Sequence, residues 1–329
     1  MKTYLQNGLC YDRPHIIDEQ QTFSIQEINS PVEKYIHTGD EILYDLDGEL
    51  VLLYDTLRDL YFNDTKSYYR EFESLPQFVI QSGQNSDFPI DTEKFKELIN
   101  EFTKTNSNIN RYLYLVDCQY LVGTIQNLLS GMEDCLCNFF VNLSQVDVLE
   151  RNIWTNTIVS VSSYQSRNLS ALLETYFTKA YSILDVLCKI AFEIENPNKD
   201  FTTYKKLRCA KVLWGDRKRL NMKNTPKTVF ENTDTVKMIE AIRNEVVHNG
   251  TWELNPKVFV SVDDGEIKER FMLFPDFREG HLDTVINRRH FFSGNIKVNN
   301  ILPTIHTEYL QMILNTVKHL NSFEKNIEI

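Results

Sequence analysis

The sequence predicts a mainly α-helical protein, with a helical bundle in its C-terminal part, a β-hairpin inserted in that bundle, and an N-terminal region of mixed α and β structure. Beyond residue 91, apolar residues recur every three or four positions over long stretches, which indicates helices that pack on one another. Two Asp-Gly pairs between apolar runs are typical of hairpins. We expect an N-terminal region, 1–107, and a helical domain, 108–329, whose core spans 168–325.

Residues 41–54 carry the clearest pattern of the N-terminal region. Apolar and polar residues alternate and the run breaks at Asp47-Gly48, which predicts a hairpin because both central residues of such a turn take positive φ. Asp45, Asp47 and Glu49 also offer the oxygen ligands that calcium takes, but the glycine falls at the wrong place for an EF-hand loop. We therefore favour a plain hairpin over a metal site.

The remaining elements follow in order along the chain. Helical periodicity predicts each helix, and Asn249-Gly250 ends one of them because glycine readily takes the left-handed conformation at a helix end. Alternating valines around Asp264-Gly265 predict the inserted hairpin. The predicted elements are a polar surface loop over 65–89, helices over 95–102, 112–141, 168–195, 200–213 and 234–248, a hairpin over 256–274, and a last helix that Pro303 opens.

Composition places the chain among ordinary globular proteins. Hydrophobic residues make up 42% and charged residues 25%, which argues against disorder. No apolar run reaches the roughly 18 residues of a membrane span, and the first residues lack the apolar core of a signal peptide, so we expect a cytoplasmic protein without a membrane partner. The cysteines lack the two-residue gap of zinc or redox motifs, which predicts free and mostly buried thiols. They are Cys10, Cys118, Cys135, Cys137, Cys188 and Cys209.

The acidity of the chain belongs to its N-terminal third. The formal net charge is −11. Residues 1–100 hold 19 acidic and 8 basic side chains, a difference of −11, which leaves 27 of each kind in the rest of the chain. A nucleic-acid partner for the remaining residues is therefore not excluded by the total charge.

One segment, Arg243-Asn244-Glu245-Val246-Val247-His248, carries reactive chemistry. The GxxxxGK, GxGxxG, HExxH and GxSxG motifs are absent, so nucleotide, dinucleotide, zincin and serine-hydrolase functions have no anchor in the sequence. Arg243 should project from an apolar stripe, where a cation is costly unless it is paired or used. His248 shares a face with Asn244, and the negative end of the helix dipole favours a protonated imidazole there. The expected stripe comprises Val236, Ile239, Val246 and Val247.

A purely structural alternative explains the same residues. Arg243 would then pair with a carboxylate of the core, and His248 would cap the end of its helix. Spacing and placement alone do not separate the two interpretations.

The order of the helices resembles the HEPN superfamily (higher eukaryotes and prokaryotes nucleotide-binding). A long helix rich in Tyr, Leu and Asp, which contains Tyr176–Asp185, precedes a helix that ends in Arg-Asn-x-x-x-His. The family signature is Arg, four to six residues and His, often with Asn directly after the Arg, and Arg243, Asn244 and His248 match it. The resemblance covers about residues 168–325. The acidic N-terminal region has no counterpart, and the hairpin departs from the minimal bundle.

The resemblance implies both an activity and partners. HEPN proteins are helical bundles, usually dimers, and many are metal-independent RNA endonucleases of toxin–antitoxin, antiviral or CRISPR systems. It therefore implies an endoribonuclease that needs no cofactor and leaves 2′,3′-cyclic phosphate, acting as a toxin or defence effector. Its partners would be RNA, a second copy, and an antitoxin or other regulatory protein. The alternatives are an inactive HEPN module that binds a partner protein or nucleotide, and a structural bundle with Arg243 paired in the core.

The chemistry of RNA cleavage suits these residue types. The 2′-OH is the nucleophile, so catalysis requires a base for its proton, an acid for the leaving oxygen and positive charge at phosphorus. His248 can transfer protons, Arg243 can contact phosphate with two nitrogens, and Asn244 can orient either one. Because the motif holds one histidine and two proton transfers are needed, a two-fold dimer would complete the site.

A basic stretch offers an RNA-binding surface. Nine cations stand against Asp216 alone, a local net charge of 9 − 1 = +8. Trp214 could stack on a base or lie in the core, and the alternative for the whole stretch is a solvated face. Arg288-Arg289-His290 is a weaker second patch. The proposed RNA-binding residues are Lys205, Lys206, Arg208, Lys211, Arg217, Lys218 and Arg219, followed by Lys223 and Lys227.

Overall fold

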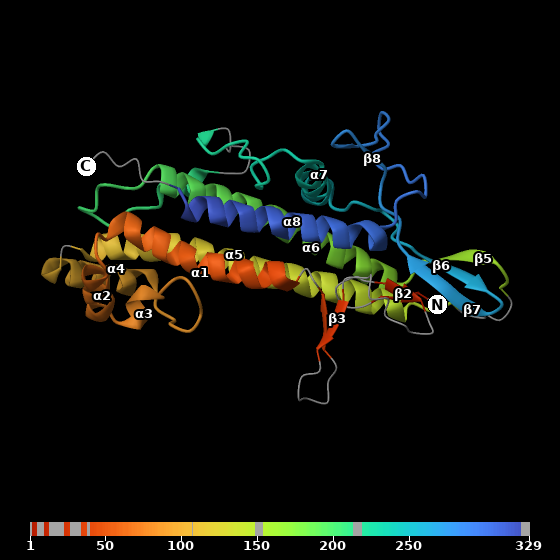
Figure 1. Ribbon diagram of the computed structural model, residues 1–329. Helices are drawn as coiled ribbons and strands as arrows, with labels where there is room; N and C mark the ends of the chain where they lie inside the picture. The colour runs from red at the N-terminus through yellow and green to blue at the C-terminus, as the bar shows by residue number, and fades with distance from the viewer. Residues whose placement is uncertain are drawn as a thin grey trace. The chain divides into compact units, whose positions relative to one another are not determined.

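Long helices dominate the fold, and the sheets are small and antiparallel (Figure 1). The computed structural model describes residues 2–4, 10–12, 23–26, 34–37, 40–106, 108–148, 154–212 and 219–323, with side chains from residue 42 onward. The helices are α1 (Asp40–Tyr61), α2 (Thr65–Ser74), α3 (Gln77–Ile80), α4 (Thr92–Thr105), α5 (Ile109–Gln145), α6 (Tyr164–Glu195), α7 (Asp234–Asn249) and α8 (Val298–Asn321). The predicted mainly α-helical class is confirmed.

The strands form short ladders. The pairs are β1 (Lys2–Tyr4) with β2 (Cys10–Asp12), β3 (Phe23–Gln26) with β4 (Lys34–His37), and β8 (Phe277–Arg278) with β9 (His281–Leu282). A three-stranded sheet has the order β5 (Thr157–Val161), β6 (Val258–Asp263), β7 (Glu266–Phe271), and Figure 1 shows its strands side by side.

The hairpin predicted between α7 and α8 is confirmed as β6 and β7. Its turn residues Asp264 and Gly265 have φ of 49° and 75°, as a tight hairpin turn requires. The third strand, β5, was not predicted, and it pairs with β6 so that Val159 lies opposite Val260.

Residues 40–61 form one helix, and the hairpin predicted around Asp47-Gly48 is wrong. The reason is a second pattern in the same residues, in which leucines recur at helical spacing. These leucines are at most 1% exposed, and burying each is worth about 1.5–3 kcal/mol, which outweighs the roughly 1 kcal/mol cost of Gly48 inside a helix. They are Leu46, Leu50, Leu53 and Leu57. The acidic side chains of Asp45 and Asp47 face solvent.

The replacement Gly48→Ala should raise the free energy of unfolding by about 0.5–1 kcal/mol. In α1 the added Cβ meets no atom within 4 Å, so only the helix propensity changes. The control is Gly83→Ala, which also enters open space but at a φ of +77°, where alanine is strained. Urea unfolding should therefore show opposite signs for the two variants. A destabilised Gly48→Ala would restore the hairpin interpretation.

Two other segments also differ from the sequence-based expectation. The predicted loop over 65–89 contains α2 and α3, and α2 begins where the Asp64 carboxylate accepts a hydrogen bond from the Ser67 backbone N–H (2.8 Å). The predicted helix over 200–213 is absent from its described residues, which hold only a short 3₁₀ turn, η2 (Arg208–Lys211). Asp200 instead accepts a bond from the nearby Thr202 backbone N–H (3.0 Å), a local turn that competes with helix formation.

The last helix begins earlier than predicted. Pro303 lies inside α8 rather than at its start, because the helix already begins at Val298. The Val298 backbone N–H donates to the Met272 carbonyl (2.9 Å) just after the hairpin, so a contact distant in sequence fixes the first turn. Proline has no backbone N–H to donate. Near the start of a helix this removes few intrahelical hydrogen bonds, because the first N–H groups have no intrahelical acceptor.

The chain forms two compact units. Unit 1 comprises Met1–Leu46, Asn127–Ile183 and Asn224–Asn315, and unit 2 comprises Asp47–Gln126, Leu184–Lys223 and Thr316–Ile329. Four of the unit boundaries fall inside α1, α5, α6 and α8, and the fifth, between Lys223 and Asn224, precedes α7. The division into an N-terminal region, 1–107, and a helical domain, 108–329, stays a prediction.

Polar links inside unit 1 fix α6 against its neighbours. The Tyr309 hydroxyl of α8 donates to the Ala180 carbonyl of α6 (2.7 Å). His306 of α8 lies between the Tyr176 hydroxyl (3.1 Å from Nδ1) and the Glu133 carboxylate of α5 (2.6 Å from Nε2). Because Tyr176 and His306 are buried, their hydrogen bond and that of Tyr309 tie α6 to α8, whereas the contact with Glu133 is an ion-pair distance.

The cysteine prediction is confirmed for the side chains that the structure describes. Those of Cys118, Cys135, Cys188 and Cys209 are buried free thiols, and that of Cys137 is half-buried. The prediction for Cys10 lies outside the described side chains. Among the described helices, none combines the length and the apolar character that a membrane span requires.

Candidate active site on helix α7

Local signals define α7 at both ends. The Thr233 side chain accepts a hydrogen bond from the Val236 backbone N–H (3.3 Å) at the start of the helix. Gly250 ends the helix with a φ of 87°, as predicted. The buried face consists of Thr235, Val236, Ile239 and Ile242.

The predicted apolar stripe around Arg243 is shorter than expected. Val236 and Ile239 are buried, but Val247 is 51% exposed, so the stripe fades toward the end of the helix. Arg243 lies where the buried face gives way to the exposed last turn, and its side chain is half-buried.

Arg243 is held by a ring and an amide. Its guanidinium carbon lies 4.3 Å from the centroid of the Tyr181 ring of α6, and its Nη1 donates to the Asn244 Oδ1 (3.0 Å). Within the described part of the chain, no carboxylate lies at ion-pair distance from Arg243. The guanidinium is therefore oriented by neutral groups and keeps its full charge and further N–H donors for a ligand.

Asn244 and His248 have different roles in this geometry. Asn244 orients Arg243 through its side-chain oxygen. His248 is exposed in the last turn of α7. The predicted motif residues thus lie on one stretch of helix, with a fixed cation and a solvent-accessible imidazole.

Glu245 connects the motif helix to a distant loop. Its Oε2 accepts a hydrogen bond from Asn249 Nδ2 (2.9 Å) and lies 3.3 Å from His290 Nε2 and 3.6 Å from Arg289 Nη1. His290 Nε2 has no aligned hydrogen-bond partner among the described residues, so the contact with Glu245 is an ion-pair distance. Because Glu245 and His248 are three residues apart on a helix, they are neighbours on its surface.

The environment of His290 tunes its protonation. Burial lowers the pKa of His290, and the Glu245 carboxylate opposes that shift. The effect of burial on the pKa is larger than that of the carboxylate, so the neutral imidazole is favoured. A neutral imidazole accepts protons at neutral pH. From the sequence alone, His290 belonged only to a weak basic patch and Glu245 had no assigned role, because no local spacing joins residues so far apart in the chain.

Exposed apolar side chains border this site. Val247 precedes His248, and Ile286 and Phe291 belong to the loop that brings His290 to Glu245. Ile286 is 96% exposed and has a φ of 54°, an unusual conformation for a β-branched residue. A strained isoleucine that is exposed to water is unfavourable. This turn is therefore a candidate for a surface that another molecule covers.

The basic stretch lies in unit 2 up to Lys223, whereas Lys227 and the motif lie in unit 1. Lys205 pairs with Asp200, and Arg208 donates to the Asn196 carbonyl (3.0 Å). Lys206 and Lys211 are exposed. Arg219 is exposed too, whereas Trp214, Arg217 and Lys218 lie outside the described residues.

Chemically, the α7 site offers one cation for an anion and two imidazoles for proton transfer. No group of three or more His, Cys, Asp or Glu side chains gathers to hold a metal ion in the part of the chain that the structure describes. No protein-family model, curated protein or solved structure matches the chain.

Proposed function

We propose that this chain is a metal-independent endoribonuclease of the HEPN type, and that Arg243, Asn244 and His248 form its catalytic site. The observation that supports this most is the state of Arg243, which is half-buried, oriented by Asn244 and Tyr181, and has no carboxylate partner among the described residues. A structural arginine would be paired, whereas a phosphate-binding arginine must stay available.

The reaction divides into two proton transfers around one phosphorus. A base takes the proton of the 2′-OH, the 2′ oxygen attacks phosphorus, and the bond from phosphorus to the 5′ oxygen breaks. An acid then supplies a proton to that leaving oxygen. The products are a 2′,3′-cyclic phosphate and a 5′-hydroxyl. Arg243 stabilises the negative charge on the phosphorane oxygens.

Two sources can supply the second proton-transfer group. In a two-fold dimer it is the partner's His248, as the resemblance implies, and exposed Val247, Ile286 and Phe291 suit such an interface. Within one chain it is His290, which burial keeps neutral beside Glu245. We propose the dimer as the working form, because exposed apolar residues occur both on the motif helix, at Val247, and on the loop that reaches Glu245, at Ile286 and Phe291.

The experiment that tests this function uses purified protein, a single-stranded RNA oligonucleotide and excess EDTA. We expect cleavage at an undiminished rate, with 2′,3′-cyclic phosphate on the upstream product, because the proposed chemistry uses only side chains and the 2′-OH. The same substrate with a 2′-deoxy residue at the cut position is the control and should stay intact. A magnesium requirement, or cleavage of the deoxy substrate, would contradict the proposal and leave the inactive binding module as the better function.

A further inference from the structure

A long irregular segment crosses the surface of unit 2 and is fixed there by α5. We call residues 197–207 the strap. Asn110 Nδ2 donates to the Phe201 carbonyl (3.2 Å), and the Tyr204 hydroxyl donates to Asp117 Oδ2 (2.5 Å). Just beyond the strap, the Arg208 backbone N–H donates to the Tyr114 hydroxyl (3.0 Å). The strap is thus held in place without regular secondary structure, which is common for binding segments.

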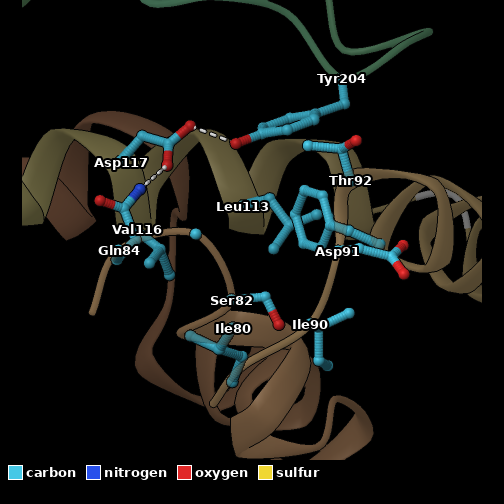
Figure 2. Close-up of a pocket in the computed structure, with 12 residues that line it drawn as sticks. Ile80, Ser82, Gln84, Ile90, Asp91, Thr92, Leu113, Val116, Asp117 and Tyr204 are labelled. Atoms are coloured by element: carbon cyan, nitrogen blue, oxygen red, sulfur yellow. Dashed lines mark hydrogen bonds between the residues drawn. The ribbon is translucent and has the colours of Figure 1, made fainter. Parts of the chain in front are cut away.

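Three cavities adjoin the strap, and two of them share a wall of Gln84, Asp117 and Tyr204. Figure 2 shows this wall from the smaller cavity of about 210 Å³, with dashed lines from Asp117 to Tyr204 and to Gln84. The larger of the two cavities that share this wall measures about 510 Å³. That volume falls within the range of small-ligand sites, roughly 300–1,000 Å³.

Lysines give the larger cavity a positive lining. Lys189 of α6 and Lys205 and Lys206 of the strap border it. Lys205 pairs with Asp200, but within the described residues neither Lys189 nor Lys206 has a carboxylate at ion-pair distance. Lys189 is half-buried, and its positive charge opposes the rise that burial causes in the pKa of the Cys209 thiol beside it. An unpaired half-buried ammonium group favours an anionic ligand.

The shared wall presents hydrogen-bond acceptors to the same cavity. Each oxygen of the Asp117 carboxylate accepts one bond, from Gln84 (3.2 Å) or Tyr204 (2.5 Å), and a carboxylate has about four acceptor positions. Burial raises the pKa of Asp117 to about 6, and the bonds from Tyr204 and Gln84 only partly offset that rise. At neutral pH the carboxylate is therefore mostly ionised and takes donors from a ligand.

We propose that the larger cavity is a binding site for a small phosphate ester whose organic part carries hydrogen-bond donors. Lys189 and Lys206 hold the phosphate, and Asp117 accepts hydrogen bonds from the organic part. Two cations opposite one acceptor wall select a ligand with an anionic end and a hydrogen-bond donor end. Inorganic phosphate and uncharged molecules should therefore bind more weakly than such a ligand. The site lies entirely in unit 2 and does not rest on the proposed ribonuclease activity.

The phosphate group that binds the lysines could belong to a free small ester or to the backbone of RNA. Because Lys206 also belongs to the basic stretch, the test must separate them. The full-length protein is titrated calorimetrically with AMP, with adenosine, with inorganic phosphate and with a short oligoribonucleotide whose reactive 2′ positions are methylated.

We expect AMP to bind saturably at one site, at least about ten-fold more tightly than adenosine or phosphate, because each lacks one of the two contacts. Lys206→Gln should weaken AMP about ten-fold, since one charge-assisted bond is lost. Lys189→Gln should do the same, with its melting temperature compared to the wild type because Lys189 is half-buried. The matched control is Lys94→Gln, an exposed lysine of unit 2 that lines neither cavity and should leave AMP binding unchanged.

Three outcomes would overturn the proposal. The first is the absence of saturable AMP binding. The second is an equal weakening in Lys94→Gln, which would mean that net charge alone is responsible. The third is an oligoribonucleotide that displaces AMP and binds more tightly, with its own affinity reduced by Lys206→Gln, because that would assign the phosphate contacts to RNA.

Discussion

Replacing His248 by alanine should reduce RNA cleavage by about 10²–10⁴-fold and leave the protein folded. The size of the loss is that of removing a positioned proton-transfer group. The fold should persist because His248 is exposed in the last turn of α7, outside the buried face of that helix. The measurements are single-turnover cleavage in EDTA and thermal unfolding of the same preparation.

The matched control for this variant is His281→Ala. His281 is also an exposed histidine of unit 1, on β9, and no step of the proposed reaction uses it. Its removal should leave the cleavage rate unchanged. His248→Ala protein that cuts RNA at the wild-type rate would remove His248 from the mechanism.

A third variant, His290→Gln, separates the two sources of the second proton transfer. If the partner's His248 supplies that transfer, His290→Gln keeps the wild-type rate and the pH profile of cleavage. If His290 supplies it, the rate falls and one limb of the pH profile is lost. Light scattering of the same protein then shows whether the active form is a dimer.

Arg243→Lys should lose about 10²–10³-fold of cleavage activity even though the positive charge is kept. In the proposed mechanism the planar guanidinium contacts two phosphate oxygens at once, while it lies over the Tyr181 ring and bonds to Asn244. An ammonium group would reproduce none of these geometries. Arg243→Ala should be equally inactive. It should also lower the free energy of unfolding by about 0.5–1 kcal/mol, because the contact with the Tyr181 ring is removed.

The appropriate control is Arg278→Lys. The Arg278 side chain is 76% exposed and pairs with Asp283, so the same substitution there tests the chemical change without the site. Cleavage and urea unfolding should both match the wild type. Full activity in Arg243→Lys would show that charge alone is sufficient, and the bidentate role of Arg243 would then be wrong.

The candidate site could be predicted only in part. Arg243, Asn244 and His248 follow one another on a single helix, and the sequence contains the signals that start and end that helix. The loop around β8 and β9 brings His290 to Glu245. No spacing pattern in the sequence predicts that contact. The cavity lined by Lys189 and Asp117 could not be predicted either, because its walls come from four separated stretches of the chain.

The sequence by itself determined features that depend on neighbouring residues. Three such features depend on residues that are close together in the sequence. They are the left-handed end of α7 at Gly250, the turn at Asp264-Gly265 and the long helix α6. Only the tertiary structure decided between patterns that coexist in one segment. Around Gly48, alternation and helical spacing were both present, and α1 formed because its leucines are buried in the folded protein. Local sequence signals determine turns and helix ends. The free energy that decides between competing elements comes from burial of apolar side chains, which depends on contacts between residues distant in the sequence.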